Sequence, residues 1–275
     1  MINKIDIQMT DMCNRRCKWC PMLQYSQNKI MDKYIIYKIK DIMDKYSYLF
    51  SENCKLTLSR YNEPLLYPDL MKEYLRILKN SKIKFKFTVN TNGDFLNKID
   101  LDNYLKDIDL FIINNYDNID EITAKINLMD YFRTYKILEN MQHIPSEHLL
   151  RFNYNNTDIE YVYNKAQIMN TRDRGGSLSY NDNLHWINKN NCIRKSCDLI
   201  GNVLSIDVNG DVYPCCDTCG MIKHHHKICC GNILKDNFLT IYNKITNLQL
   251  FEDICGHCTT TYNTVIGEKN DNNSR

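Results

Sequence analysis

The sequence contains little glycine and proline, no excess of one charge and no long apolar run. With 9 glycines and 5 prolines in 275 residues, it is unlike collagen or the Pro- and Gly-rich chains that stay disordered. Its 35 basic and 33 acidic residues leave a net charge of +2, which argues against general binding of nucleic acids. No apolar run approaches the roughly 18 residues that a membrane helix needs, so we expect no membrane partner.

Cysteine is the residue that the chain has in excess. Charged residues appear within the first six positions, which is unlike a signal peptide, and we expect a cytoplasmic protein. The cytoplasm keeps thiols reduced, and the 13 cysteines form an odd number that cannot pair completely. Thiolates are good ligands for iron–sulfur clusters and for zinc, so the cysteines indicate metal binding.

Strand-like and helix-like segments alternate between residues 4 and 114. Apolar alternation predicts strands at residues 4–9, 56–59, 85–90 and 110–114. Helical spacing predicts helices at residues 32–45, 69–78 and 101–107, the second of them capped by Asp69. Repeated strand–helix units predict a parallel sheet, in which the chemistry lies at the carboxyl ends of the strands.

The later part of the chain is less regular. Two further strands, a turn and a linker are expected at residues 149–154, 166–170, 172–176 and 180–191. A hairpin is predicted over residues 203–213, with Asn209-Gly210 as its turn, and a helix over residues 238–248.

The sharpest motif is the triplet Cys13, Cys17 and Cys20, which follows the first predicted strand. Three thiolates on one short loop can hold three irons of a [4Fe–4S] cluster and leave the fourth iron open to a substrate or cofactor. The alternatives are a zinc knuckle that lacks one ligand, or chance. No catalytic acid or base is assigned from the sequence, because the chemistry would begin at this cluster.

Residues 13–21 resemble the signature of the radical S-adenosylmethionine (SAM) superfamily. The resemblance implies that the open iron chelates SAM and that an electron from the cluster cleaves SAM to a 5′-deoxyadenosyl radical, which takes a hydrogen atom from the substrate. In such enzymes the cofactor carries the difficult chemistry, and the protein orients and shields it.

Three further segments resemble motifs of the superfamily in the same order, namely residues 59–65, 91–96 and 174–176. The resemblance implies that Glu63 accepts hydrogen bonds from the SAM ammonium group and that Arg174 reaches into the active site. Asn62 stands where the family usually has glycine. The candidate cofactor-binding residues are Trp19, Asn62, Glu63, Asn92 and Arg174. Each segment alone also fits an ordinary turn, and the family's adenine-contacting motif is not found.

A second group of cysteines resembles the SPASM or twitch extensions of the superfamily. The resemblance assigns one auxiliary [4Fe–4S] cluster to Cys197, Cys215, Cys255 and Cys258. No cysteine follows Cys258, which favours the one-cluster twitch form. Two pairs of thiolates would also suit a tetrahedral zinc ion.

Six cysteines remain, namely Cys54, Cys192, Cys216, Cys219, Cys229 and Cys230. We expect Cys54 to be a small buried apolar residue, and Cys192 lies too far from Gly210 to replace Cys197 in the pattern. The last four, with His224–His226, form an insertion that is either an additional metal site or an ordinary loop. A third hypothesis is that one of these thiols donates a hydrogen atom to a substrate radical.

The sequence therefore predicts an α/β fold, a partial (β/α)6 TIM-like barrel over residues 1–185, with a twitch/SPASM-like iron–sulfur domain at 186–262 and a polar tail at 263–275. The expected cofactors are two [4Fe–4S] clusters and SAM, and the expected partner is an external electron donor such as flavodoxin or ferredoxin.

Within the superfamily the motifs look most like the radical SAM dehydrogenase of butirosin (aminoglycoside) biosynthesis. This resemblance implies an oxidoreductase that oxidises a small polyol, sugar or aminocyclitol and passes an electron to the auxiliary cluster. The alternative is a maturase that crosslinks or epimerises a ribosomal peptide. It is less favoured because Cys13 lies too near the start for a preceding peptide-binding domain. A metal-binding module without enzymatic activity is a third possibility.

Overall fold

The computed structural model describes residues 1–17, 20, 26–165, 192–194, 197–249, 252–255, 258 and 266–268. Its main sheet has ten strands in the order β11-β10-β9-β1-β2-β3-β4-β7-β6-β5, and β8 pairs separately with β12. The strands are β1 (Ile2–Ile7), β2 (Phe50–Thr57), β3 (Lys86–Thr91), β4 (Leu110–Asn114), β5 (Gln142–Ile144), β6 (Leu149–Tyr154), β7 (Thr157–Val162), β8 (Cys192–Arg194), β9 (Val203–Ile206), β10 (Asp211–Tyr213), β11 (Gly231–Asn232) and β12 (Ile266–Glu268).

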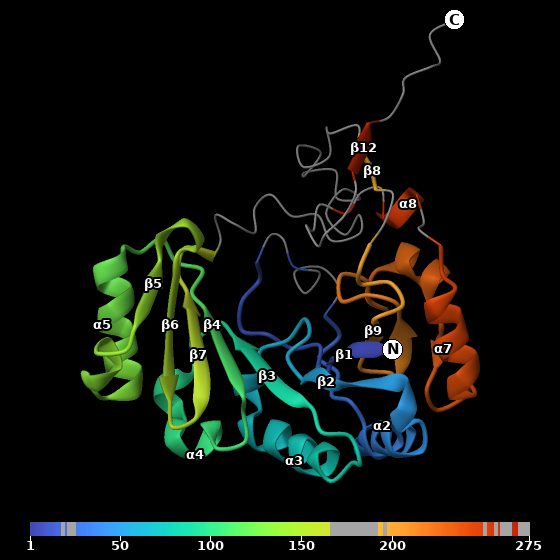
Figure 1. Ribbon diagram of the computed structural model, residues 1–275, viewed down its shortest axis with the longest axis horizontal. Coiled ribbons are helices and arrows are strands. Elements are labelled where there is room, and N and C mark those ends of the chain that lie inside the picture. Colours follow the sequence, from blue (N-terminus) through green and yellow to red (C-terminus); the bar gives the residue numbers. More distant parts are fainter. Residues whose placement is uncertain are drawn as a thin grey trace, which may run out of the picture.

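Six consecutive strands of the main sheet, from β9 to β7, are parallel to their neighbours. Helices cover the convex outer side of this curved sheet, and the loop after β1 lies on its inner side (Figure 1). The helices are α2 (Lys33–Lys45), α3 (Pro68–Lys79), α4 (Leu101–Leu105), α5 (Glu121–Phe132), α7 (Phe238–Thr246) and α8 (Glu252–Cys255). The predicted α/β fold with a parallel-rich sheet is confirmed.

Helix α2 shows how the sequence builds this outer layer. The side chain of Asp32 accepts a hydrogen bond from the backbone N–H of Tyr34 and so caps the helix. Residues at helical spacing then bury one face against the sheet, namely Ile35, Ile36, Ile39, Ile42 and Met43. In α3 the expected cap is wrong: Asp69 lies inside the first turn, and Tyr67 occupies the N-cap position without a side-chain hydrogen bond.

The inner side of the sheet is polar at β1. Ile5 and Ile7 belong to the main core, and alternation along the strand turns Asp6 to the opposite face. Asp6 and Gln8 are nevertheless buried, and Gln8 Nε2 lies 3.7 Å from the sulfur of Met221. Residues of the C-terminal part of the chain therefore cover the inner face of the first strand.

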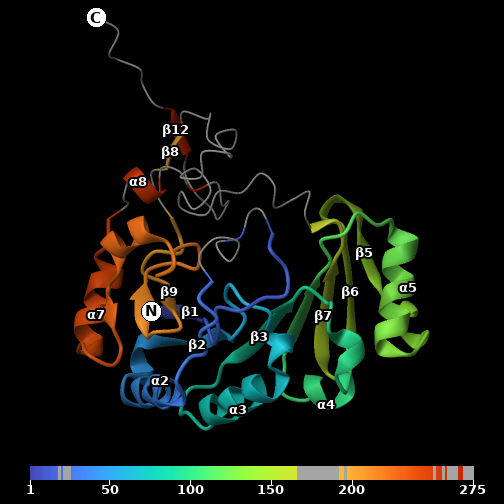
Figure 2. The ribbon, with the colours of Figure 1, turned by 180° about the vertical axis from the view of Figure 1, so that it is seen from behind.

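The C-terminal hairpin continues the sheet of the barrel (Figure 2). Strand β9 pairs in parallel with β1, from Lys4 opposite Val203 to Ile7 opposite Ile206. The predicted Asn209-Gly210 turn then leads into the antiparallel strand β10, and Gly210 has a φ of +84° that favours glycine. One sheet thus joins the first strand of the chain to the domain that carries the second cysteine group.

Residues 119–164 contain elements that the sequence did not reveal. The predicted strand at 149–154 is β6, but it is antiparallel to β7. Asn155 and Asn156 both have positive φ values, which forms the tight turn between them. Helix α5 was missed because Ile122 and Ile126 are exposed, which blurs its apolar periodicity.

Some predictions fall on parts of the chain that are not described. The expected strand at 166–170, the turn at 172–176 and the linker at 180–191 all lie outside the described residues. Among the helices that are described, none combines the length and the apolar character needed to cross a membrane.

Candidate active site

The three cysteines of the first motif lie in the loop that follows β1, and all three are half-buried. A turn joins Cys17 and Cys20, because the N–H of Cys20 donates to the carbonyl of Cys17 at 3.0 Å. Burial raises the pKa of Cys13 to about 11, and the nearby charges of Glu63, Cys20 and Cys17 add to this. Bound iron would counteract this shift, because a cationic metal favours the thiolate form of its cysteine ligands.

Glu63 lies in the loop that follows β2 and is 1% exposed. Its Oε1 accepts hydrogen bonds from Leu65 N at 3.0 Å and Thr91 Oγ1 at 2.7 Å, and its Oε2 accepts one from Asn92 N at 2.7 Å. Its own N–H donates to the carbonyl of Met12. Burial raises the pKa of this carboxyl to about 7, although the three hydrogen bonds oppose the shift.

Asn92 connects the turn after β3 to the cysteine loop. Its Nδ2 donates to Asn14 Oδ1 at 2.8 Å and lies 3.9 Å from the sulfur of Cys13. Asn62 is directed elsewhere: its amide donates to the carbonyl of Leu58 at 3.2 Å. Of the five predicted cofactor-binding residues, Glu63 and Asn92 thus meet at Cys13, whereas Trp19 and Arg174 lie outside the described residues.

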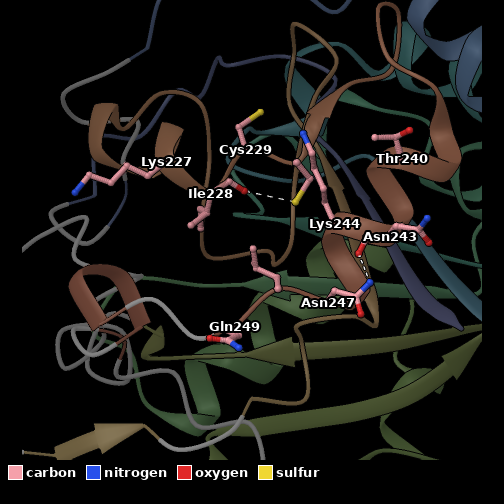
Figure 3. Close-up of a pocket in the computed structure, with 10 residues that line it drawn as sticks. Lys227, Ile228, Cys229, Thr240, Asn243, Lys244, Asn247 and Gln249 are labelled. Atoms are coloured by element: carbon pink, nitrogen blue, oxygen red, sulfur yellow. Dashed lines mark hydrogen bonds between the residues drawn. The ribbon is translucent and has the colours of Figure 1, made fainter.

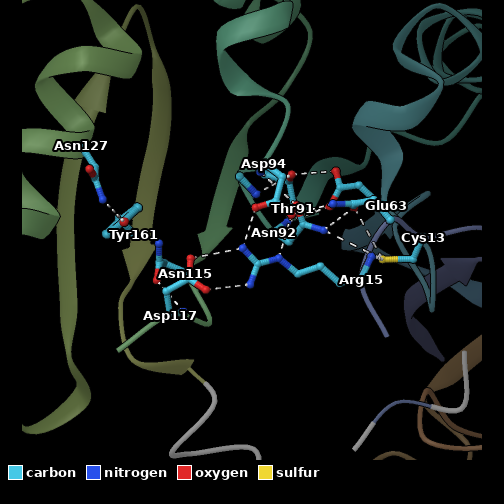
Figure 4. Close-up of polar contacts among 12 residues, drawn as sticks. Cys13, Arg15, Glu63, Thr91, Asn92, Asp94, Asn115, Asp117, Asn127 and Tyr161 are labelled. Carbon is cyan, nitrogen blue, oxygen red and sulfur yellow. Dashed lines mark hydrogen bonds and ion pairs between the residues drawn. The ribbon is translucent and has the colours of Figure 1, made fainter. Parts of the chain in front are cut away.

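Arg15 forms the most extensive polar contacts among the described residues of the loop (Figure 4). Its guanidinium donates to both carboxylate oxygens of Asp94, at 2.6 and 2.7 Å, and to Asp117 at 3.2 and 3.3 Å. These hydrogen bonds raise the pKa of Arg15. Burial opposes the ionisation of Asp94, but its hydrogen bonds with Arg15 and Asn14 outweigh burial and lower its pKa. The sequence did not reveal the contacts of Arg15 with Asp94 and Asp117, although both of these acids follow the ends of predicted strands.

The side chains around Cys13 fit a [4Fe–4S] cluster that binds SAM. A carboxylate can accept about four hydrogen bonds, and Glu63 uses three, with one acceptor position left on Oε2. A cationic ammonium group is the donor that such a buried carboxylate prefers. The contact between Glu63 and SAM remains a prediction.

The second group of cysteines surrounds a single cavity between the C-terminal hairpin and α8. Cys197, Cys215, Cys255 and Cys258 all line it, and most of the other lining residues are aliphatic. The N–H of Cys258 donates to the carbonyl of Cys255, which joins this pair in one turn. Burial raises the pKa of Cys215 well above its usual value. Four soft ligands in an apolar surrounding suit a closed [4Fe–4S] cluster.

The remaining cysteines point in different directions. Cys54 is fully buried in the core, as expected, and Cys230 belongs to the same core. Cys229 packs with Ile254 instead, and Cys219 donates its backbone N–H to the buried His225 Nδ1 at 3.2 Å. Among the described residues, no group of three or more His, Cys, Asp or Glu side chains is arranged to hold a metal ion. This applies to the insertion and to the two cluster loops.

An open groove shares two lining residues with the auxiliary cavity, and Figure 3 shows the residues that line the groove. Its lining includes Lys227 and Lys244, together with polar and apolar residues, namely Ile228, Cys229, Cys230, Thr240, Asn243, Asn247, Leu248 and Gln249. Ile228 and Leu248 also line the cavity with the four cysteines. These two side chains therefore form a wall shared by the groove and the cavity.

Comparison with known families agrees with this geometry. The model of the Radical SAM superfamily matches residues 7–164, which is more than half of the chain. The chain belongs to the radical SAM superfamily. An iron–sulfur cluster-binding domain model, SPASM, matches residues 197–259, a range that includes all four auxiliary cysteines. The cofactors of this radical SAM protein are [4Fe–4S] clusters and SAM.

The solved structures of BtrN show the same fold. The structure of BtrN in complex with AdoMet and 2-DOIA is 20% identical, with a TM-score of 0.63, and the match covers 94% of each chain. An open conformation of BtrN is 18% identical, with a TM-score of 0.51 and coverage of 90% of this chain and 83% of that one. AdoMet-bound anSMEcpe is 14% identical, with a TM-score of 0.49, covering 93% and 85%. Curated protein sequences give no match.

Proposed function

We propose that this radical SAM enzyme oxidises a secondary alcohol of a small polyol, sugar or aminocyclitol to a ketone. The observation that supports the proposal is the cavity lined by Cys197, Cys215, Cys255 and Cys258. A cluster with four thiolate ligands has no open iron for a substrate, so it suits the transfer of an electron. The fold shared with BtrN, which was crystallised with AdoMet and 2-DOIA, is consistent with a substrate of this class.

The proposed oxidation balances with the sites on this chain. The alcohol carbon loses one hydrogen atom, the hydroxyl group loses a proton to solvent or a base, and one electron leaves to the four-cysteine site. The cluster and SAM, when bound at Cys13, Cys17 and Cys20, supply the one-electron chemistry that removes the hydrogen atom. Glu63 and Asn92 are proposed to bind and orient SAM, together with Trp19 and Arg174, whereas the side-chain amide of Asn62 donates to Leu58 instead.

Product analysis with two variants tests the proposal. Purified enzyme, reconstituted without oxygen, is incubated with SAM, a reductant and a panel of polyols, sugars, aminocyclitols and peptides. The wild type should form 5′-deoxyadenosine and a ketone. Cys13→Ala should form neither, whereas Cys255→Ala should still cleave SAM but form no ketone. A crosslinked or epimerised peptide as the only product would overturn the proposal in favour of a maturase.

We also propose that an acidic electron carrier such as flavodoxin or ferredoxin docks at the groove of Figure 3. The basic residues Lys227 and Lys244 line this groove, and no acidic side chain is among the described residues that line it. Opposite charges accelerate the encounter of two proteins. The shared wall of Ile228 and Leu248 brings a docked carrier close to the four cysteines.

A further inference from the structure

Arg60 is a buried cation that neither the motifs nor the family matches assign. It follows β2, three residues before Glu63, and is 4% exposed. Its Nη2 donates to the carbonyl of Thr218, a residue of the C-terminal domain. Its Nε and Nη1 have no hydrogen-bond partner among the described residues. Two unsatisfied donors on a buried guanidinium are costly, which indicates a role beyond packing.

The two sides of Arg60 face the two groups of cysteines. On one side, its guanidinium carbon lies 5.3 Å from the centre of the Tyr61 ring. That ring belongs to a small apolar cluster which contacts the N-terminal cysteine loop; the cluster is formed by Tyr61, Cys219 and Ile222, with Cys13, Cys20 and Met221 packed against it. Arg60 is therefore connected to the SAM site through a single side chain.

On the other side, Thr218 connects Arg60 to the auxiliary site. The hydroxyl of Thr218 donates to the carbonyl of Cys215 at 3.1 Å and lies 3.5 Å from its sulfur. Thr218 itself lines the cavity with the four cysteines. The carbonyl that accepts from Arg60 is thus part of the same turn as a predicted cluster ligand.

The charge of Arg60 persists in this environment. Burial opposes ionisation, but neighbouring acidic groups, which include Asp6 and Asp207, raise the pKa of Arg60 above the ordinary value. Arginine in any case stays protonated in proteins. A [4Fe–4S] cluster with four thiolates is anionic, and its reduction potential depends on nearby charge and on burial.

We propose that Arg60 is a positioning residue that stabilises the reduced form of the auxiliary cluster. It lies between the two cysteine groups and carries a fixed positive charge that gains attraction when the neighbouring cluster gains an electron. This inference rests on the proposed function, in which the four-cysteine site receives an electron from the substrate. Arg60 would make that site a better electron acceptor without touching the substrate.

The test is a redox titration of the holoenzyme followed by EPR. Addition of SAM perturbs the signal of the cluster with the open iron, which separates it from the auxiliary signal. Arg60→Met should reduce the ratio of reduced to oxidised auxiliary cluster at least tenfold at a fixed potential, a shift of about 59 mV for a one-electron couple. Arg60→Lys, which keeps the charge, should restore most of the wild-type potential.

Arg60→Gln serves as a second neutral variant that can still donate a hydrogen bond. Full iron content with an unchanged auxiliary potential in either neutral variant would overturn the inference. Loss of auxiliary iron from both would also overturn it, because Arg60 would then only support the fold. If the neutral variants shift the auxiliary potential but the wild-type enzyme makes no ketone, the proposed function is contradicted. The effect of the Arg60 charge on the cluster is then still supported.

Discussion

The guanidinium of Arg15 donates to both carboxylate oxygens of Asp94, at 2.6 and 2.7 Å. This pair joins the cysteine loop to the turn after β3, which are 79 residues apart in sequence. Asn14 and Asn92 make a parallel connection between the same two segments at 2.8 Å. The position of Cys13 relative to Glu63 therefore depends on side chains that flank the cysteines, as well as on the cysteines themselves.

Removal of this pair should loosen the cysteine loop. Both side chains are partly exposed, so we expect Arg15→Met to lower the free energy of unfolding by only about 1 kcal/mol. The larger effect should be faster loss of iron from the N-terminal loop, because its thiols are held less firmly. Iron and sulfide content after gel filtration measures this loss.

The matched control is Lys79→Met, which removes an exposed ion pair with Asp107 at 2.8 Å on the outer side of the barrel. It should retain wild-type iron content. Equal iron retention in Arg15→Met and Lys79→Met would show that the Arg15–Asp94 pair does not hold the loop.

SAM binding should depend on pH through Glu63. Burial raises the pKa of its carboxyl to about 7, so the group gains a proton as the pH falls below that value. The protonated form cannot pair with the SAM ammonium, and affinity should fall by up to about tenfold for each pH unit below 7. Equilibrium dialysis of SAM with the reconstituted enzyme, between about pH 6 and pH 8, measures the effect.

Glu63→Gln should bind SAM more weakly at about pH 8 and should lose the pH dependence. Glu139→Gln, at an exposed position, should behave as the wild type. A pH profile in Glu63→Gln that matches the wild type would assign the titration to another group.

Charge reversal in the groove should slow electron exchange with an acidic carrier. In Lys227→Glu/Lys244→Glu, the rate constant with flavodoxin should fall by about tenfold or more at low salt, and high salt should reduce the difference. Stopped-flow absorbance of flavodoxin measures this rate. Lys82→Glu/Lys84→Glu, an exposed pair before β3, is the control. An equally slow control would indicate an effect of net charge alone.

Gly93 should tolerate substitution less well than Gly201. Both have positive φ values, +84° and +86°, so alanine is strained at either position and costs about 1–3 kcal/mol. A Cβ at Gly93 would also lie 3.1 Å from Ile113 Cγ2, whereas at Gly201 the nearest atom is 3.8 Å away. Urea denaturation should give the lower midpoint for Gly93→Ala. Equal midpoints would mean that Ile113 moves aside freely.

The sequence predicts the local parts of the fold better than its long-range contacts. Strand β4 and helix α2 follow from apolar periodicity. The spacing of the cysteines in the sequence is enough to indicate the cluster loop. The contact between Arg60 and Thr218 joins residues 158 positions apart, and no local pattern reports it. Strand β7 and its antiparallel pairing with β6 were missed because Asn155-Asn156 was not read as a hairpin turn.

The parallel pairing of β9 with β1 has a consequence for how the chain is made. Strand β1 leaves the ribosome first, but its neighbour β9 begins only at Val203, so one edge of β1 stays open while the intervening residues are synthesised. An open strand edge invites pairing with other chains. A fragment that ends at residue 165 would keep this edge permanently. The barrel and the cluster-binding domain therefore share one sheet, although two family models describe them.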